Sequence, residues 1–461
     1  MSVEDELDCI HEFVLERTGE RLINTDLERN ILRGLWQGMT YDDIAEDSNC
    51  HRSTVGDVLK KIYKLVWQAV GEKIKKDNFR EVIERTLRSQ QSGKILSPQD
   101  SVADRVQQSA LAANFVGSAT TIANLRQDWG AALDVSIFFG RTDELTTLEQ
   151  WIVEEHCRLL AIWGMAGIGK SFLARKLADN IKDKFEYIIW RSLNHAPLVQ
   201  DVLADLIEFF SNKQETVLPD ATVSGTSRLM EYLQAHPCLV ILDGVETLLS
   251  TGQLAGRYRE GYQEYGKLFR QIGQLKHQSC IMLTSSEKSR EIASLVGKSS
   301  PVRVYKLEGL KKDAAQNILR EQGLIEEEEW RSLIEHYRGN PLYLKIVSTL
   351  IIEIFNGKAS EFIKENTIFI GQIHEVLEQL FERLSNLEID VMCKLAITNK
   401  PVSINRLREL ISAPLSSSQL MEVLESLMLR SMIEKVTECS ELLYGLQPVV
   451  RKYVINRFCQ A

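Results

Sequence analysis

The central part of the chain alternates short apolar runs with longer stretches of helical periodicity. Each apolar run is bounded by polar or turn-forming residues, and the stretches between the runs repeat their apolar positions every three or four residues. This alternation is typical of a parallel sheet whose strands are joined by helices. The pattern predicts five strands, at residues 158–164, 187–192, 239–243, 280–285 and 302–307.

Residues 1–90 have helical periodicity throughout. The first strong apolar stripe ends at Leu35, and Gly38 is placed to close that helix. Thr40 is a candidate N-cap for a short second helix, and a longer third helix begins near Val55. A helix, a short second helix, a turn and a longer helix follow the plan of a helix-turn-helix.

The remaining segments are of two kinds. Residues 89–130 are rich in Ser, Gln, Ala and Gly and poor in large apolar side chains, which predicts a linker. After about residue 311 the pattern is again mostly helical, with one strand pair predicted near 433–436 and 442–446. The chain has no repeat of fixed period, which excludes a solenoid or a propeller.

The composition is that of a soluble protein with several domains. The chain has 461 residues, of which 44% are hydrophobic and 26% are charged, and this balance excludes a disordered or fibrous chain. No apolar run is long enough to span a membrane, and the acidic start MSVEDELDCIHEF lacks the features of a secretory signal. The eight cysteines include no C-x-x-C pair, so neither a zinc site nor a disulfide framework is predicted. We therefore expect a cytoplasmic protein with reduced thiols and no membrane contact.

Charge is unevenly distributed on a chain whose net charge is −9. Residues 1–50 carry 13 acidic side chains against 4 arginines, whereas residues 51–90 carry 10 basic side chains against 5 acidic ones. Candidate DNA-contacting residues begin and extend the third helix: Arg52, Ser53, Thr54, Lys60, Lys61 and Lys64. Two interpretations stay open: this helix contacts DNA phosphates and base edges, or the three helices dock onto a protein. The acidic first helices disfavour DNA.

The strongest chemical signal is the stretch GMAGIGKS at residues 164–171, which fits G-x-x-x-x-G-K-[ST]. A strand-like run precedes it and an amphipathic stretch follows it. Glycines let backbone N–H groups approach phosphates, and the N-terminus of the following helix favours negative charge. Lys170 would pair with the β- and γ-phosphates, and Ser171 would ligate Mg²⁺. The candidate nucleotide-binding residues here are Gly164, Gly167, Ile168, Gly169, Lys170, Ser171 and Phe172.

A second acidic element is predicted at the end of the apolar run 239–243. Asp243 ends this run and, with Ser171, is a candidate ligand of Mg²⁺. The next residue is Gly244, so the second acid often found at that position is absent. Glu246 is a candidate general base, which makes Asp243 and Glu246 the candidate catalytic residues. A solvated surface glutamate is an equally good interpretation of Glu246.

Two further motifs complete a resemblance to the STAND-class P-loop NTPases of the NB-ARC type. Residues 138–144, FFGRTDE, resemble the h-h-G-R-E element that opens such domains, and residues 339–342, GNPL, resemble the G-x-P motif of their helical subdomain. The resemblance covers about residues 136–457. The sequence of several of its segments is similar to a group of these proteins found in cyanobacteria. In that group a vWA-MoxR-associated helix-turn-helix domain precedes the NTPase, and residues 20–88 resemble that domain.

The resemblance implies a molecular switch that binds ATP or ADP with Mg²⁺. Phe139, Arg141 and Pro341 would contact the adenine. ADP would hold the domains closed, and ATP would let them rotate and expose an oligomerisation face. The implied partners are the nucleotide, a protein effector or sensor bound through the N-terminal domain, and further copies of the chain in a nucleotide-dependent homo-oligomer.

The predicted architecture is multidomain. It combines an α-helical domain, an α/β P-loop NTPase domain with a parallel sheet, a helical lid and a winged-helix domain. The predicted parts are a helix-turn-helix domain at 1–89, a linker at 90–135, a nucleotide-binding domain at 136–306, a helical subdomain at 307–375 and a winged-helix-like domain at 376–461.

Two positions depart from the family pattern. Ser286 replaces the arginine that would sense the γ-phosphate, and Gln447 stands where the family usually has a histidine that touches the β-phosphate of ADP. Together with Gly244, these changes leave open whether the protein is a slow ATPase or a hydrolytically silent adaptor. A DNA-binding transcriptional regulator with an NTPase core is the other alternative. The family usually carries a repeat sensor after this point, and the end at Ala461 suggests sensing through a partner or an adaptor role.

Overall fold

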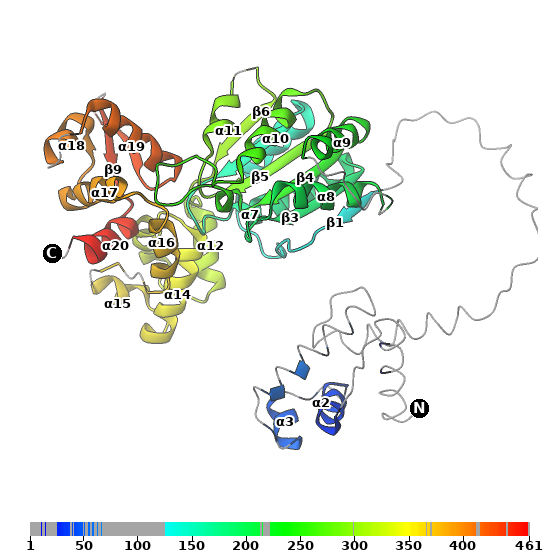
Figure 1. The fold of residues 1–461 in the computed structure, drawn as a ribbon. Coiled ribbons are helices and arrows are strands. Elements are labelled where there is room, and N and C mark those ends of the chain that lie inside the picture. The colour runs from blue at the N-terminus through cyan, green and yellow to red at the C-terminus, as the bar shows by residue number, and fades with distance from the viewer. Residues whose placement is uncertain are drawn as a thin grey trace, which may run out of the picture. The chain divides into compact units, whose positions relative to one another are not determined.

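The computed structural model divides the chain into two compact units, Met1–Ser118 and Ala119–Ala461 (Figure 1). In the first unit it describes residues 11, 14, 25–36, 39, 41–48, 50, 54, 55, 58, 59, 62 and 66. In the second unit it describes residues 125–212, 214, 222–297, 299–365, 367–368, 371–411, 415–438 and 441–459.

The first unit contains helices α2 (Asp26–Trp36) and α3 (Tyr41–Asp47), and the described residues from 54 to 66 are helical as well. Val55, Leu59 and Ile62 in that last segment are buried, as the spacing of the sequence predicts. Thr54 is helical and partly buried. The other candidate DNA-contacting residues lie outside the described residues: Arg52, Ser53, Lys60, Lys61 and Lys64.

The second unit is built on a six-stranded sheet in which every neighbouring pair is parallel, with the order β1-β3-β4-β5-β2-β6. The strands are β1 (Arg126–Asp128), β2 (Leu159–Trp163), β3 (Tyr187–Ser192), β4 (Cys238–Asp243), β5 (Cys280–Ser285) and β6 (Val302–Lys306). The five strands predicted from the apolar runs are confirmed; β2, β4 and β5 are buried along almost their whole length, and the edge strand β6 is mostly half-buried.

Strand β1 corrects one expectation, since it lies inside the segment predicted to be a linker. Its sequence is Arg-Gln-Asp, its side chains are exposed or half-buried, and it occupies the edge of the sheet beside β3. A polar edge strand of three residues contains no apolar run, so the hydrophobic pattern does not predict it. The part of the predicted linker from residue 125 onward therefore belongs to the sheet domain.

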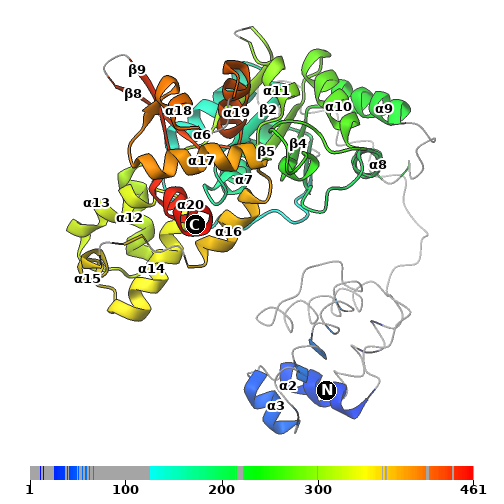
Figure 2. The ribbon, with the colours of Figure 1, turned by 60° about the vertical axis from the view of Figure 1, so that its left-hand side comes forward.

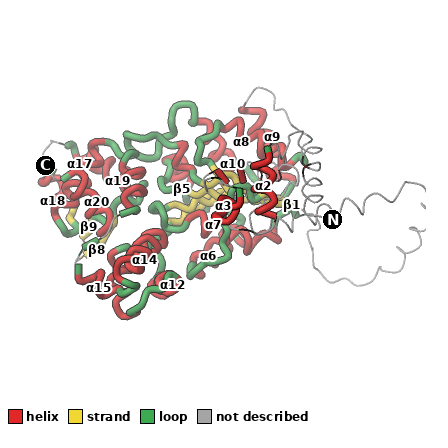
Figure 3. The backbone as a smooth tube through the Cα atoms, turned by 90° about the horizontal axis from the view of Figure 1, so that it is seen from below, coloured by secondary structure: helices red, strands yellow, loops and turns green. Residues whose placement is uncertain are grey.

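Helices cover both faces of the sheet (Figure 3). Leu239 and Ile241 of β4 pack into one apolar cluster, and Val240 and Leu242 pack into the other. The first face is covered by α6 (Thr142–Glu149), the π-helical turn η2 (Gln150–Glu154) and α7 (Lys170–Ile181), which ends in the 3-10 turn η3 (Lys182–Lys184). The second face is covered by α8 (Val199–Phe210), α9 (Thr222–Ala235), α10 (Gln263–Gln274) and α11 (Arg290–Leu295), and the 3-10 turn η4 (Val245–Leu248) follows β4.

A helical lid follows the sheet, as the sequence predicts. Its elements are α12 (Lys312–Glu321), the 3-10 turn η5 (Glu327–Glu329), α13 (Trp330–His336), α14 (Pro341–Phe355) and α15 (Ala359–Lys364). The buried side chains of Trp330, Leu333 and Leu344 belong to the apolar cluster that covers the first face of the sheet. Figures 1 and 2 place the lid helices beside α16 (Ile373–Phe381), which begins the last part of the chain.

The C-terminal domain has a three-stranded antiparallel sheet of order β7-β9-β8. Its elements are α16 (Ile373–Phe381), α17 (Asn386–Thr398), β7 (Val402–Ser403), α18 (Ile404–Leu410), α19 (Ser417–Leu429), β8 (Glu434–Glu438), β9 (Glu441–Gly445) and α20 (Pro448–Phe458). The predicted strand pair is present as β8 and β9. From α17 onward, the elements follow the order helix-strand-helix-helix-strand-strand, and the winged helix stays a prediction. None of the helices in the described part is both long and apolar enough to cross a bilayer.

Candidate functional site

The glycine-rich loop connects β2 to α7, as its signature predicts. Gly167 and Gly169 have φ angles of 75° and 99°, in the region that side-chain-bearing residues rarely adopt. A Cβ atom at Gly167 would also lie 2.7 Å from the Cβ atom of Leu342 in the lid. Glycine is therefore required at residue 167 both for the turn of the loop and for the close approach of α14.

Lys170 is the first residue of α7, and its ammonium group turns back onto the loop. The Nζ atom donates hydrogen bonds to the carbonyl oxygens of Gly164 and Met165, both at 3.1 Å. Burial lowers the pKa of Lys170, and the nearby negative charges of Glu246 and Asp243 oppose this shift. A partly desolvated cation whose hydrogen bonds to the described residues go to carbonyl oxygens is well placed to gain from an incoming phosphate.

Ser171 and Asp243 lie together, as the two sequence motifs predict. The Ser171 hydroxyl donates to Asp243 Oδ1 at 2.5 Å, and the Thr284 hydroxyl donates to the same oxygen. Thr284 also accepts a hydrogen bond of 3.2 Å from the N–H of Gly244. The ends of β4 and β5 thus present a set of oxygen atoms beside the first turn of α7, and oxygen ligands are those that Mg²⁺ prefers.

Glu246 lies on the turn η4, three residues after Asp243. Its Oε2 atom is buried and has no hydrogen-bond partner among the described residues, and its charge acts on Lys170. Gly244 has a φ of 90°, and a Cβ there would lie 2.5 Å from Oδ1 of Asn194, so an acid at residue 244 would strain the backbone and displace that side chain. Glu246 is therefore the second acid beside the half-buried Lys170, as the sequence allowed.

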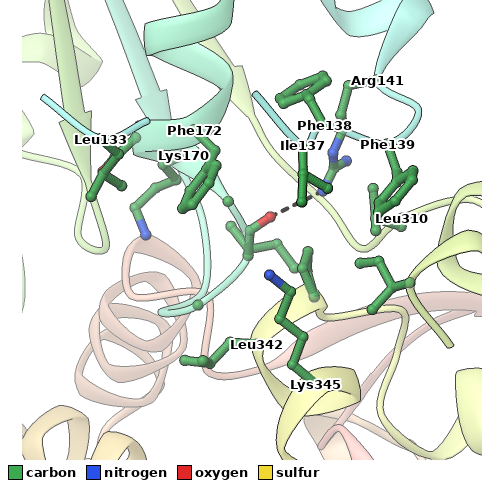
Figure 4. Close-up of a pocket in the computed structure, with 16 residues that line it drawn as sticks. Leu133, Ile137, Phe138, Phe139, Arg141, Lys170, Phe172, Leu310, Leu342 and Lys345 are labelled. Atoms are coloured by element: carbon green, nitrogen blue, oxygen red, sulfur yellow. Dashed lines mark hydrogen bonds between the residues drawn. The ribbon is translucent and has the colours of Figure 1, made fainter. Parts of the chain in front are cut away.

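The loop borders a cavity of about 310 Å³ between the sheet domain and the lid (Figure 4). Most of the predicted binding residues line it: Phe139, Arg141, Gly167, Ile168, Gly169, Lys170, Ser171, Phe172 and Pro341. Gly164, Asp243 and Glu246 lie outside this lining. The cavity thus brings together the two motifs that the sequence placed around a nucleotide, at residues 138–144 and 339–342.

Seven lining residues were missed by sequence reasoning: Leu133, Ile137, Phe138, Leu310, Ile318, Leu342 and Lys345. Phe138 and Leu342 lie inside the motifs at residues 138–144 and 339–342, so those motifs could have identified them as lining residues. Leu133 lies in the segment read as a linker, which hid it. In Figure 4, Leu342 and Lys345 of the lid lie on the opposite side of the cavity from Phe172 and Phe138.

Arg141 connects the opening motif to the phosphate loop. Its φ is 65°, and its side chain is 5% exposed. The guanidinium Nη2 donates to the carbonyl of Ile168 at 3.1 Å, and Nη1 forms an ion pair with Glu144 at 2.8 Å. Arg141 therefore lines the cavity while it fixes the backbone of the loop.

Asn340 connects the lid to the same loop. Its side-chain amide donates to the carbonyl of Ala166 at 3.0 Å, and its Oδ1 accepts from the N–H of Leu342 at 3.1 Å, which caps α14. The N–H of Leu342 lies 3.4 Å from the carbonyl of Gly167. The lid thus meets the phosphate loop through its capping residue and the first turn of α14.

The two positions that depart from the family pattern lie outside the lining of this cavity. Gln447 lines a second cavity of about 410 Å³ together with Met165, Ile168 and residues of β8, and it is absent from the lining of the first cavity. Ser286 is buried directly after β5. Gln447 thus borders the same cavity as Met165 and Ile168 of the phosphate loop, and its place beside the β-phosphate of ADP stays a prediction.

Comparison with known proteins agrees with the sequence motifs. Residues 141–329 match the model of the NB-ARC domain, and residues 1–86 match the model described as vWA-MoxR associated protein N-terminal HTH. The uncharacterized WD repeat-containing protein alr2800 of Nostoc sp. is 41% identical over 346 residues, which are 72% of this chain and 27% of that protein.

The chain is also similar to a plant protein and to a solved archaeal structure. Disease resistance protein RRS1 of Arabidopsis thaliana is 28% identical over 199 residues, which are 41% of this chain and 13% of that protein. The Walker-type ATPase paby2304 of Pyrococcus abyssi superposes with a TM-score of 0.47 at 18% identity, over 69% of this chain and 96% of that one. This chain spans less than a third of the length of either curated relative. The chain thus carries a segment that matches the NB-ARC domain, preceded by a segment that matches the vWA-MoxR associated N-terminal HTH.

Proposed function

We propose that this chain is a switch that binds ATP or ADP with Mg²⁺ and changes the packing of its domains with the nucleotide state. One observation carries the proposal: the phosphate-loop signature and helix α14 of the lid border the same cavity of about 310 Å³. A ligand there contacts two domains at once, so its free energy of binding differs between arrangements of those domains.

The residues present fit a nucleotide. Apolar side chains that include Phe138, Phe139 and Pro341 border the cavity and suit the flat faces of a base. The glycine loop and the N-terminus of α7 suit phosphate oxygens, and Lys170 supplies a cation beside them. A cavity of about 310 Å³ lies at the lower end of the range for small-molecule sites.

The oxygen set beside α7 fits a divalent cation. Mg²⁺ is usually held by one or two protein oxygens together with phosphate oxygens and water, and Ser171 and Asp243 would supply the protein oxygens. The bound metal would neutralise charge between the β- and γ-phosphates. The Thr284 hydroxyl orients Asp243 for this role.

Glu246 is the proposed general base. Its buried, unpartnered Oε2 would accept a proton from the attacking water, while Asp243 holds the metal. Ser286 stands in place of a cation that would stabilise the developing charge, and a cation in such a role is worth about 10³–10⁵ in rate. We therefore propose at most a slow ATPase.

The proposed consequence of the nucleotide state is a change in which proteins this chain binds. The nucleotide state would decide whether the lid and C-terminal domain stay packed on the sheet domain, and an opened arrangement would expose a face for homo-oligomerisation. A protein effector or sensor would bind through the N-terminal segment. DNA is the alternative partner of that segment.

The test begins with the nucleotide that co-purifies with the protein, released by denaturation and identified by chromatography. We then measure the affinity of a fluorescent ADP analogue for the wild type, Lys170→Ala and the exposed control Lys276→Ala. Bound ADP or ATP that is lost in Lys170→Ala and kept in Lys276→Ala supports the proposal. No nucleotide in the wild type, and none bound after Mg-ATP is added, overturns it.

A hydrolytically silent adaptor is the second candidate. Ser286 stands in place of an arginine and Gly244 in place of a second acid, and both missing groups would promote hydrolysis. Co-purified ATP, with no phosphate release above that of Lys170→Ala, would favour the adaptor over the slow ATPase. Co-purified ADP and a measurable turnover would favour the ATPase.

A further inference from the structure

A cluster of buried charges joins the C-terminal domain to the sheet domain, close to the proposed base. We call it the Glu287 cluster, and it consists of Glu287, Arg383, Glu388, Ser426 and Arg430. Glu287 follows β5, and the other four residues belong to the C-terminal domain. Glu287, Glu388 and Arg430 are at most 3% exposed, so the cluster is part of the protein interior.

Arg383 is the residue through which this cluster reaches the proposed active site. Its Nη2 donates to Oε2 of Glu287 at 2.9 Å and to the backbone carbonyl of Glu246 at 2.9 Å. The carbonyl of Leu249 lies 3.4 Å from the same nitrogen, and Nε donates to Glu287 at 3.2 Å. One guanidinium thus bridges the segment after β5 and the turn η4 that carries Glu246.

The backbone of Arg383 is held in place as well. Its carbonyl accepts the N–H of Gly252 at 3.0 Å and a hydrogen bond from Nη1 of Arg430. Nη2 of Arg430 donates to the carbonyl of Gln253 at 2.7 Å. Both ends of the Arg383 side chain are therefore fixed across the boundary between the two domains.

The carboxylates complete the cluster. Glu388 lies 3.7 Å from Nε of Arg430 and accepts the hydroxyl of Ser426 at 2.6 Å. Ser426 in turn accepts the N–H of Ala255 at 2.6 Å, and Glu287 accepts the N–H of Gly256 at 2.8 Å. The two carboxylates of the cluster balance the charge of its two guanidinium groups. Arg383 therefore acts on η4 mainly by fixing its position and adds little net charge there.

We infer that Arg383 is a positioning residue for hydrolysis: from the docked C-terminal domain it holds η4 so that Glu246 faces the phosphate site. This inference rests on the proposed function, in which Glu246 is the base. Arg383 lies outside the lining of the nucleotide cavity and acts through the carbonyl of Glu246. Undocking of the C-terminal domain would remove this support, so the docked form hydrolyses ATP and the opened form retains it.

The test compares wild type, Arg383→Lys and the control Arg406→Lys. Lysine keeps the charge beside Glu287, but it cannot donate to that carboxylate and both carbonyls in the geometry of the guanidinium. Arg406 is an exposed arginine of the same domain. For Arg383→Lys we expect kcat for phosphate release to fall by about tenfold or more. KM and the affinity for ADP should stay within about twofold, because the nucleotide cavity is unchanged.

A rescue experiment separates positioning from folding. Arg383→Ala is assayed with guanidinium chloride at a concentration far below denaturation, and with sodium chloride at the same ionic strength. Recovery of part of the kcat with guanidinium alone supports the inference. If Arg383→Ala does not fold, Arg383→Lys decides, with its thermal unfolding midpoint measured beside kcat.

The outcomes distinguish this inference from the function on which it rests. An unchanged kcat in folded Arg383→Lys overturns the role of Arg383. A wild type that binds nucleotide without turnover also overturns it, and leaves nucleotide binding standing. A wild type that binds no nucleotide overturns the proposed function itself.

Discussion

The lid and the C-terminal domain both contact the segments around the phosphate loop, but they do so with different chemistry. The lid uses a neutral amide, in which Asn340 donates to the carbonyl of Ala166, and the first turn of α14 lies on the loop. The C-terminal domain uses the Glu287 cluster, in which Arg383 and Arg430 meet two buried carboxylates. Neutral hydrogen bonds can be lost one at a time, whereas buried ions need all their partners present.

This difference indicates which contact can act as a switch. A neutral contact of about 1 kcal/mol per hydrogen bond lets the lid follow small movements of the loop. A buried ionic contact is favourable when complete and unfavourable when partly broken, so the C-terminal domain has a docked state and an undocked state with little between them. We therefore expect the lid to sense the nucleotide and the C-terminal domain to report it.

The largest expected effect comes from the removal of Glu287, which leaves Arg383 and Arg430 without their shared carboxylate. We expect Glu287→Ala to lower the free energy of unfolding by about 3–5 kcal/mol, the cost of leaving a buried charge unpaired. Urea unfolding followed by tryptophan fluorescence measures it. The control Glu425→Ala removes an exposed carboxylate 4.0 Å from Arg290 and should cost less than about 1 kcal/mol. Equal effects of the two variants would contradict a buried ionic contact.

A smaller effect is expected at the lid. Asn340→Ala removes the cap of α14 and the hydrogen bond to Ala166, and we expect a loss of about 1–2 kcal/mol in the free energy of unfolding. The matched control is Ser416→Ala, which removes the cap of α19 without touching the phosphate loop. If Asn340→Ala costs as much as Glu287→Ala in the same urea experiment, the proposed contrast between the two contacts is wrong.

A third variant separates charge from burial. Arg338 of the lid forms an ion pair with Glu434 of β8 at 3.0 Å, and both side chains are partly exposed. We expect Glu434→Gln to change the free energy of unfolding by about 0–1 kcal/mol, and the change should shrink as salt is added. The same urea experiment at low and high sodium chloride measures both quantities. A loss near that of Glu287→Ala would mean that charge, rather than burial, makes the C-terminal contact strong.

The sequence predicted the local parts of this molecule well. The bounds of β3 and β5 match the predicted ranges, because each strand centres on a run of buried apolar residues that stands out in the sequence. The approach of Ser171 to Asp243 also follows from the sequence, because a phosphate loop and an acid at the end of a parallel strand meet at one edge of the sheet.

Other features depend on contacts that no local pattern records. The Glu287 cluster joins residues from separate segments of the chain. In the sequence alone, nothing distinguishes its charged residues from ordinary surface charges. Leu133 was hidden because it follows the short polar strand β1, which carries no apolar signal. Gln447 was assigned by its place in a motif, and it lines a cavity with Met165 and Ile168 of the phosphate loop and residues of β8, which the motif alone does not indicate. In each case tertiary packing decides what the position does.

The smallest effect should sharpen the role of the lid as the part that senses the nucleotide. Lys345 is exposed on α14 and lines the nucleotide cavity, so under the proposed function it adds a cation from the lid to the binding site. Because the side chain is exposed, we expect Lys345→Ala to weaken binding of the fluorescent ADP analogue by only about two- to fivefold, and less at high salt. The control Lys364→Ala removes an exposed lysine of the same lid that lies outside the cavity. A loss in Lys345→Ala alone, with the unfolding free energy unchanged, means that the lid reads the nucleotide through the ligand itself. Equal affinity in both variants would leave Asn340 and Pro341 as the means by which the lid contacts the site.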